Sequence, residues 1–462
     1  MGVLMRMALL AAGLAAAAGV GAAGLPEDFV GLFKAATEAY EAKDYPRMEQ
    51  KLREALKLRP GHPRALYNLA SALALGGHKN AALIELRKLE RMGLSFEVGQ
   101  DEDFAGMREW QGFKDVSRAF ARNRRSAGEA KVTFRVPAPA FIPEGLAYDD
   151  DSEAFFLGSV HERRIRRIRD DGTQDDFVAP GSVWAVLGLA IDSEQRRLWA
   201  ATAAIAEMKD AKTEELGRSA ILAYDLKSGA LKQRYAVPED GRKHSIGDLI
   251  VSRSGTVYAT DSASGDLFAL DPASGKFDAL TVAGALASPQ GLALARDRRR
   301  LYVADYTQGL YRYDLEKRAL TRLDVAEDIC VYGIDGLYRF DDDLIAVQNG
   351  IRPHRVVRFE LDRGGKRVRH ASVLAASLTE FDEPTLGVVV GRRFHFVANS
   401  QWNRFGQDHA LPPEAQLRGP VVLEVALDRR RNDAQREPRS ARGVEQQPAP
   451  LELPPVGLPP IR

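Results

Sequence analysis

The stretch QGLALARDRRRLYVADY (290–306) decides the fold of this chain. It starts with a polar residue and a glycine, continues as an apolar strand, turns at charged residues, and returns as a second apolar strand. The same pattern recurs in PEGLAYDDDSEAFFLGS (143–159), LGLAIDSEQRRLWAAT (187–202), GDLIVSRSGTVYATDS (247–262), DGLYRFDDDLIAVQNG (335–350) and PTLGVVVGRRFHFVANS (384–400). The copies begin about 43 to 60 residues apart, the length of one four-stranded blade, so they predict a six-bladed β-propeller.

Two flanking segments set the limits of this propeller, which we place at residues 131–428. The segment VTFRV (132–136) precedes the first copy and is predicted to be the outer strand of the sixth blade. That pairing closes the ring, which would otherwise expose two sheet edges. Residues 429–462 are charged, then Pro-rich, without apolar periodicity, and are predicted to be a disordered tail.

Residues 1–24 have the pattern of a signal peptide. Arg6 supplies a positive charge, Met7 to Val20 form an apolar run, and small residues follow. The run is shorter than a typical transmembrane helix, and no cysteine follows it for lipid attachment. We therefore predict export to the periplasm or the medium, with no membrane anchor after cleavage; the alternative is an uncleaved N-terminal anchor.

Residues 25–121 have apolar side chains at helical spacing, in two copies shifted by about 34 residues. The second copy resembles the tetratricopeptide repeat at Leu66, Tyr67, Asn68, Leu69, Ala70, Gly77, Ala82 and Leu86. A further helical unit over about residues 100–121 is expected to cap the stack, and residues 122–130 are expected to be a linker. The resemblance implies either a groove that binds a protein partner or a docked helical spacer.

Composition excludes several classes of protein. The 462 residues carry 65 Lys+Arg against 64 Asp+Glu, a formal net charge of +1, so a surface built for nucleic acid is not expected. Cys330 is the single cysteine, which excludes a disulfide within the chain and a multi-cysteine metal site. Apolar residues make up 45% of the chain, which suits a soluble globular core.

Blade topology predicts where chemistry can occur. In a propeller, the loop entering the first strand of each blade and the loop after its second strand lie on the same face. Glu144, Gln290 and Asp335 stand at the first of these positions and should meet at the mouth of the central channel. Further polar residues are expected around that mouth: Asp248, Asp261, Asp305, Asn349, Glu383 and Asn399. Two insertions, about 203–219 and 401–419, belong to this face too, and Trp402 is a candidate substrate wall.

The motifs PEG (143–145), SPQGLALARDRRRLYVADY (288–306) and IDGLY (334–338) resemble the family of gluconolactonases, regucalcin (senescence marker protein) and luciferin-regenerating enzymes. The resemblance covers about residues 140–400 and implies six blades, lactone hydrolysis and a divalent metal held by Glu144, Asp335 and Gln290. Gln290 stands where that family has Asn, and Gly247-Asp248 where it has Asn-Asp. The motifs IDGLY, LIAVQNG and EPTLGVV are similar to a bacterial branch with no established reaction.

Residue chemistry agrees with this implication without deciding it. Two carboxylates and an amide oxygen suit Ca²⁺, Mg²⁺ or Mn²⁺. Such a metal would polarise a lactone or ester carbonyl, with Asp335 or Asp248 as the base and His161 or His244 as alternative proton carriers.

Each of these residues also has a structural interpretation. Asx residues at strand ends bond to the turn backbone, histidines occupy ordinary loops, and Trp402 packs in a core. Two functions therefore stay open: a metal-dependent hydrolase of a lactone or small ester, or a non-catalytic propeller that binds a small ligand or a protein.

Overall fold

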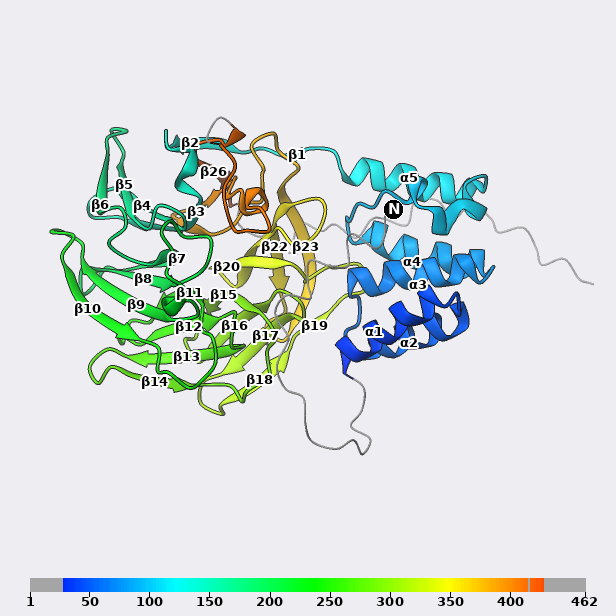
Figure 1. The fold of residues 1–462 in the computed structure, drawn as a ribbon, viewed down its shortest axis with the longest axis horizontal. Coiled ribbons are helices and arrows are strands. Elements are labelled where there is room, and N and C mark those ends of the chain that lie inside the picture. Colours follow the sequence, from blue (N-terminus) through cyan, green and yellow to red (C-terminus); the bar gives the residue numbers. More distant parts are fainter. Residues whose placement is uncertain (1–27, 414–415, 428–462) are drawn as a thin grey trace, which may run out of the picture. The chain divides into compact units, whose positions relative to one another are not determined.

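A computed structural model describes residues 28–413 and 416–427 (Figure 1). The expected signal peptide, residues 1–24, and the expected tail, residues 429–462, lie outside the described residues. In the described part, the chain forms an N-terminal helical region followed by a β-propeller.

From residue 28 on, the N-terminal region contains five α-helices and two 3-10 helices: α1 (Phe29–Glu41), α2 (Tyr45–Leu58), α3 (Pro63–Leu75), α4 (Lys79–Arg91), η3 (Val98–Gln100), η4 (Glu102–Met107) and α5 (Gln111–Asn123). Asp28 and Asp44 begin the first two helices, because their carboxylates accept hydrogen bonds from the amides of Gly31 (2.7 Å) and Arg47 (3.1 Å). Pro63 begins α3, where its missing N–H costs no hydrogen bond. None of the helices in the described ranges is long and apolar enough to cross a membrane.

Six sheets, each with four antiparallel blade strands, form the six blades, which confirms the predicted fold. Blade 1 consists of β3 (Pro143–Asp149), β4 (Ala154–Ser159), β5 (Ile165–Arg169) and β6 (Gln174–Val178), and blade 2 of β7 (Ala185–Asp192), β8 (Arg197–Ala203), β9 (Ser219–Asp225) and β10 (Leu231–Ala236). Blade 3 consists of β11 (Ile246–Val251), β12 (Val257–Asp261), β13 (Asp266–Asp271) and β14 (Lys276–Ala279), and blade 4 of β15 (Pro289–Leu294), β16 (Arg300–Asp305), β17 (Gly309–Asp314) and β18 (Ala319–Arg322). Blade 5 contains β20 (Ile334–Phe340), β21 (Asp343–Gln348), β22 (Arg355–Leu361) and β23 (Arg367–Ala376), and blade 6 contains β24 (Gly387–Val390), β25 (Arg393–Val397), β26 (Val421–Ala426) and β2 (Lys131–Arg135).

Blade 6 closes the ring as the sequence predicts, because β2 pairs with β26 from the far end of the propeller. Blade 5 differs from the expected four strands. Two short strands, β1 (Ala127–Gly128) and β19 (Asp324–Val325), pair with β23 and widen that sheet to six strands. β1 also places part of the expected linker, residues 122–130, in a sheet.

The first strand of each blade lies innermost and packs against the first strands of neighbouring blades around the channel. In five blades this strand has a bulge near its start. The register of β3, β7, β11, β15 and β20 shifts there. A glycine allows the close approach: a Cβ on Gly145 would lie 2.1 Å from the Leu187 carbonyl oxygen, and one on Gly291 2.2 Å from the Leu337 amide. The residue before this glycine is Glu144 in blade 1, Gln290 in blade 4 and Asp335 in blade 5. The bulges thus set the predicted residues at equivalent places in the ring.

The helical region packs against blades 4 and 5. Helix residues such as Leu66 and Leu69 belong to the same buried apolar cluster as Val331 and Tyr332, which precede β20. Hydrogen bonds join the two regions: Tyr332 Oη to the Pro60 carbonyl (2.8 Å), the Ser95 amide to the Arg352 carbonyl (2.8 Å), Arg59 Nη1 to the Thr307 carbonyl (3.4 Å) and Arg355 Nη1 to the Met92 carbonyl (2.9 Å). The propeller loops in these bonds either enter β20 or follow β16 and β21, so the helices sit on the face that carries the channel mouth.

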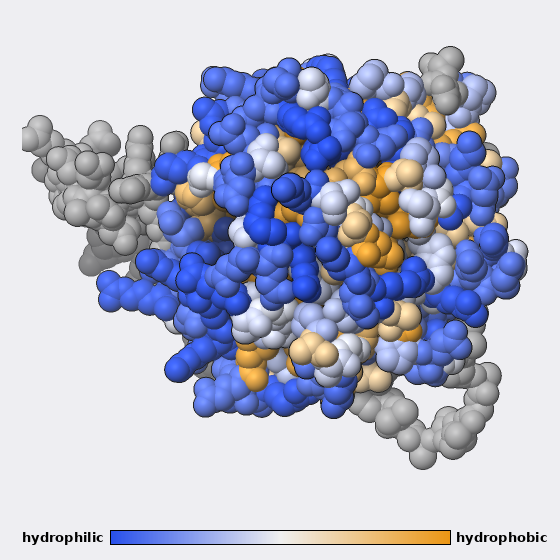
Figure 2. Space-filling view, turned by 90° about the vertical axis from the view of Figure 1, so that its left-hand side faces the viewer, coloured by the Kyte–Doolittle hydropathy of each residue, from blue (hydrophilic) through white to orange (hydrophobic). Residues whose placement is uncertain are grey.

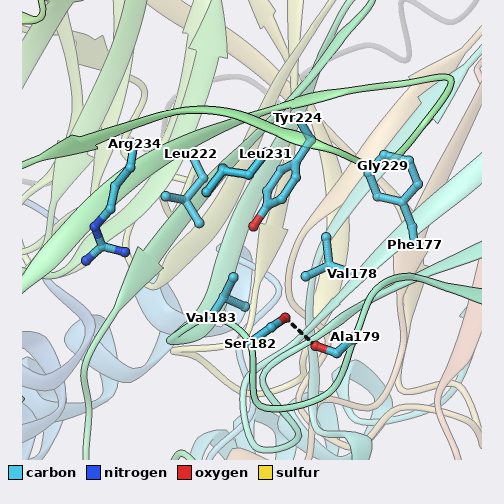
Figure 3. Close-up of a pocket in the computed structure, with 10 residues that line it drawn as sticks. All are labelled: Phe177, Val178, Ala179, Ser182, Val183, Leu222, Tyr224, Gly229, Leu231 and Arg234. Carbon is cyan, nitrogen blue, oxygen red and sulfur yellow. Dashed lines mark hydrogen bonds between the residues drawn. The ribbon is translucent and has the colours of Figure 1, made fainter.

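The side of the molecule where β6 and β10 lie in Figure 1 is mainly hydrophilic, with apolar side chains gathered near its middle (Figure 2). A cleft of about 290 Å³ with both polar and apolar lining lies between the outer strands of blades 1 and 2 (Figure 3). No carboxylate, histidine or cysteine lines it; the lining residues are Phe177, Val178, Ala179, Ser182, Val183, Leu222, Tyr224, Gly229, Leu231 and Arg234.

Candidate active site

Glu144 lies at the start of β3, is 8% exposed, and is held by a tryptophan from the last insertion. Trp402 Nε1 donates to Glu144 Oε2 at 2.7 Å. Trp402 stands in η7 (Trp402–Arg404), in the loop between β25 and β26. The bond fixes one oxygen of Glu144 and leaves Oε1 without a hydrogen-bond partner among the described residues.

Asp335, at the start of β20, is half-buried and ends a short chain of hydrogen bonds. Asn349 Nδ2 donates to Asp335 Oδ2 at 2.6 Å, and Tyr306 Oη donates to Asn349 Oδ1 at 3.0 Å. Asn349 and Tyr306 follow the second strands of blades 5 and 4. The chain orients the Asp335 carboxylate from one side and leaves Oδ1 free of hydrogen bonds in the described part of the protein.

Four carboxylates at the mouth influence one another. Burial is the largest cause that raises the pKa of Glu144, Asp248, Asp335 and Glu383. Like charge adds to it: Asp335, Glu383 and Asp248 raise the pKa of Glu144, and Glu383 raises that of Asp335. The pKa of Asp335 rises to about 7 and that of Asp248 to about 8. Lys, Arg and His make no ion pair with these four groups within the described ranges. Burial and like charge thus favour a proton or a cation on these carboxylates, and the nearby Arg352 lowers the pKa of Glu383 without forming an ion pair with it.

Glu383 and Gln290 complete this set. Glu383 Oε2 accepts a hydrogen bond from the Asn403 amide at 2.8 Å, so the blade 6 insertion also holds this carboxylate. Its backbone has φ +67°, a left-handed conformation uncommon for glutamate and often found at functional sites. Gln290 Nε2 donates to Ser288 Oγ at 3.2 Å, which leaves the amide oxygen available as a ligand.

Asp248 is buried and bonds to backbone on two blades. Its carboxylate accepts hydrogen bonds from the Leu249 amide (2.8 Å) and from the Leu292 amide in the next blade. It occupies the place that glycine fills in blades 1, 2, 4 and 5. This placement favours a clamp between blades 3 and 4 over the predicted role of catalytic base.

Three of the predicted rim residues use their side chains for hydrogen bonds to the backbone. Asp261 and Asp305 end the second strands of blades 3 and 4, and their carboxylates accept amide hydrogen bonds from the adjoining loops. Asn399 bonds the Val421 amide and the Gly419 carbonyl. The structural interpretation therefore accounts for these three residues. The pairing register explains why Asn349 differs: Gln348, one residue earlier, is the equivalent of Asp305, so Asn349 is free to face Asp335.

Neither His161 nor His244 forms a hydrogen bond with the four mouth carboxylates Glu144, Asp248, Asp335 and Glu383. His244 is buried between Asp261 (Nδ1 to Oδ2, 2.7 Å) and Asp240 (Nε2 to Oδ1, 3.1 Å), and the Asp261 hydrogen bond is the main cause that raises its pKa. His161 Nδ1 lies 2.8 Å from the Glu207 carbonyl oxygen, at the junction of the blade 1 and blade 2 loops. His161 thus lies on the rim wall, and His244 holds the loop before β11.

Two tyrosines of the mouth were not predicted. Tyr306 follows Asp305 directly, and the same register that selects Asn349 selects Tyr306. Tyr338 accepts a hydrogen bond from the Gly387 amide at 2.7 Å, and burial together with Asp248, Asp335 and Glu144 raises its pKa well above the usual value. Both phenols therefore stay neutral beside the carboxylates. The position after the strand-end residue would have identified Tyr306 from the sequence.

The two propeller insertions form one apolar wall of the mouth. Buried Met208 and Ala204 from the blade 2 insertion share a cluster with Leu187, and Trp402 and Phe405 from the blade 6 insertion pack against it. An ion pair between His409 and Glu207 (2.8 Å) joins the two insertions at the surface. The opposite side of the mouth is formed by blades 4 and 5 and the helical region.

A closed six-bladed propeller with buried carboxylates at one channel mouth is the class that this fold and site define. The sequence profile of the SMP-30/gluconolactonase/LRE-like family matches residues 142–381, more than half of the chain. The protein therefore belongs to that family, which confirms the resemblance seen in its motifs. The helical region and the blade 6 insertion lie outside the matched residues.

Several solved structures share the fold at low identity. The gluconolactonase XC5397 from Xanthomonas campestris is 18% identical, over 66% of this chain and 99% of that chain, with a TM-score of 0.44. A luciferin-regenerating enzyme is 14% identical over 64% and 95%, with a TM-score of 0.45. Virginiamycin B lyase from Staphylococcus aureus is 14% identical over 65% and 100%, with a TM-score of 0.45. No curated protein matches the sequence.

Proposed function

We propose that this protein hydrolyses a lactone or similar small ester at the channel mouth, with a bound divalent cation. The observation that carries the proposal is the group of buried and half-buried carboxylates whose pKa values are raised and which form no ion pair with Lys, Arg or His among the described residues. Ionised carboxylates without a counter-ion are costly at such burial, so the site favours a cation or protons.

The side chains at the mouth fit a divalent cation in charge and in donor type. Glu144 Oε1, Asp335 Oδ1 and the Gln290 amide oxygen are hard oxygen donors, the kind that Ca²⁺, Mg²⁺ or Mn²⁺ prefer, and none of them accepts a hydrogen bond from a described residue. The described residues contain no ready-made group of three His, Cys, Asp or Glu ligands, so Gln290 and water would have to complete the set. When bound, such a cation polarises a carbonyl oxygen and lowers the pKa of water.

The chain's own residues would then bind substrate and move one proton. Asp335 would hold the cation at Oδ1 and take a proton at Oδ2, the oxygen that Asn349 orients, as a water oxygen attacks the carbonyl carbon. It returns that proton to the leaving alkoxide when the carbon–oxygen ester bond breaks. Asn349 and Tyr306 keep the carboxylate oriented, and Trp402 keeps Glu144 in place. The apolar wall around Met208 and Phe405 excludes bulk water from one side.

A panel of lactones and esters, assayed with and without a chelator, tests the proposal. Glu144→Gln with Asp335→Asn should lower kcat/KM by at least about 100-fold, since both acids act on the reacting centre. A matched double variant, Glu214→Gln with Asp328→Asn, removes two exposed carboxylates and should retain wild-type activity. Turnover that survives in the first double variant, or that ignores the chelator, contradicts the proposal.

A non-catalytic propeller that binds a small ligand is the second candidate. One oxygen each of Glu144 and Asp335 is already hydrogen-bonded by Trp402 and Asn349, which is what a preformed binding site needs. The same panel separates the two functions, because a binding protein would show saturable binding and no turnover.

We also propose export and a protein partner as open roles of the flanking regions. The apolar run with Arg6 supports export, which N-terminal sequencing of the mature protein from a periplasmic fraction or the medium would test. The helical region, with its repeated helix pairs, supports a partner at its exposed side. Comparing co-purified proteins for the full chain and for a variant with exposed helix residues changed, such as Val30→Asp with Ile84→Asp, would test it.

A further inference from the structure

Two exposed arginines border the mouth from different parts of the chain. Arg64 is the second residue of α3, and Arg352 lies in the loop between β21 and β22. Neither guanidinium has an ion pair or hydrogen bond with any described residue. They are therefore cationic groups that the fold leaves available beside an acidic site.

Backbone and ring contacts place both arginines around Tyr306. The His62 ring, two residues before Arg64, packs edge-on against Tyr332 with centroids 5.0 Å apart. The amide of Gly333, the next residue, donates to the Tyr306 carbonyl at 2.9 Å. These contacts bring the start of α3 next to the tyrosine.

Arg352 reaches the same place from blade 5. It follows Asn349 by three residues, and Asn349 accepts the Tyr306 hydroxyl at 3.0 Å. The Ser95 amide donates to the Arg352 carbonyl at 2.8 Å, so the helical region also fixes this loop. The charges of both arginines favour the ionised form of the Tyr306 phenol, and Arg352 does the same for the Glu383 carboxyl, which agrees with this placement.

The chemistry of a guanidinium points to an oxyanion. Its planar set of N–H donors matches the oxygens of a carboxylate or a phosphate. The charge of Arg352 acts on Glu383, one of the mouth carboxylates. Ionised carboxylates there repel a phosphate dianion more strongly than a singly charged carboxylate. Charge therefore favours a carboxylate at this rim.

We propose that Arg64 and Arg352 form a subsite for the carboxylate of the ligand, so that the site takes an acidic lactone or ester. The ester part of this inference rests on the proposed function; the carboxylate subsite does not. Because Arg64 belongs to the helical region, outside the family match at 142–381, the helices would supply part of the ligand specificity. A substrate anchored at the rim would place its ring toward Asp335 and Glu144.

Calorimetry with a pair of stable ring ketones tests the subsite. The probes are 3-oxocyclopentane-1-carboxylate and its neutral carboxamide, which keep a ring carbonyl but cannot be hydrolysed. The full-length protein should bind the carboxylate at least about tenfold more tightly, the usual gain from charge-assisted hydrogen bonds. Arg64→Ala with Arg352→Ala should remove this preference and leave carboxamide binding unchanged.

Two controls make the result specific. Arg363→Ala, an exposed arginine on the opposite face, should leave the preference intact. Arg64→Lys with Arg352→Lys keeps the charge and should retain part of it. Inorganic phosphate should compete weakly; competition stronger than that of acetate would overturn the carboxylate assignment.

The outcomes separate this inference from the proposed function. Equal affinity for the two probes, no binding of the carboxylate probe, or a preference that survives in the double alanine variant overturns the subsite, even if neutral lactones are hydrolysed. A carboxylate preference that depends on both arginines supports the subsite, even if no lactone is turned over.

Discussion

The two sides of the channel mouth are built in different ways. On the side of blades 1, 2 and 6, the walls are insertions of the propeller itself, and apolar packing around Met208, Trp402 and Phe405 holds them. On the side of blades 4 and 5, the helical region holds the loops through hydrogen bonds to their backbone carbonyls. Each side ends on one acid: Trp402 donates to Glu144, and Asn349 donates to Asp335.

This difference shows that a region outside the propeller can help to position one of the two acids at the mouth. The loop of Asn349 continues to Arg352 and Arg355, both of which bond to the helical region. Arg355 also donates to Gln348, the residue next to Asn349 (2.7 Å). The orientation of Asp335 therefore depends on helices outside the propeller, whereas that of Glu144 depends on the propeller alone.

The largest effect is expected from Arg355→Met on the helical side. Arg355 is buried, and its loss leaves the Gln348 amide oxygen and the Met92 carbonyl without their donor. Two unsatisfied buried acceptors should lower the free energy of unfolding by about 2–5 kcal/mol. Denaturant unfolding measures this, with exposed Arg363→Met as the control. An unchanged midpoint would show that the helices do not depend on this contact.

Removing the donor on each side should lower activity by a smaller amount. Trp402→Phe keeps the ring but loses the hydrogen bond to Glu144, and Asn349→Ala loses the one to Asp335. Each should reduce kcat/KM on the best lactone about 10- to 100-fold, with the fold retained. If the two sides act independently, the effects multiply in the double variant; a double variant no worse than either single one would show that both donors serve one acid pair.

The six-bladed propeller and the acids Glu144 and Asp335 could be predicted from the sequence, but the residues that orient the two acids could not. Period-two strands and the glycines at 145, 188, 291 and 336 repeat locally, so six blades and their closure by β2 followed from the pattern. Glu144 and Asp335 followed from their place before those glycines. The distinction between Asp305 and Asn349 depends on the pairing register at a bulge, which the pattern does not fix. The bond from Trp402 to Glu144 joins residues 258 positions apart, and docking of helices on blades 4 and 5 is likewise long-range.

Asp248, in blade 3, belongs to neither of the two sides compared above. Its ionisation should make the stability of the fold depend on pH. Its pKa is about 8 in the fold against about 4 when unfolded, so the folded protein holds a proton that the unfolded chain loses. The stability this provides is present below pH about 4 and is lost as the pH rises toward 8. With chelator present, Asp248→Asn should lose less stability than wild type between these pH values, measured by thermal unfolding. Parallel pH curves would mean that the Asp248 carboxyl is not buried as described.

The smallest effect is expected where the two insertions meet at the surface. His409 is half-exposed and pairs with Glu207, and exposed pairs of this kind contribute little. His409→Ala should shift the thermal midpoint by no more than about 1 °C, since apolar packing, not this pair, holds the wall. A larger shift would show that the contact between His409 and Glu207, and not only the apolar cluster, stabilises the wall.

The most direct test of the account is the binding of a divalent cation to the metal-free full-length protein. Titration with Mn²⁺ should show one saturable site in the wild type and in Glu214→Gln with Asp328→Asn. The site should be lost in Glu144→Gln with Asp335→Asn while the fold is kept, because the charges of those two acids interact at the mouth. Equal Mn²⁺ binding by both double variants would contradict the claim that the two sides of the mouth form one site.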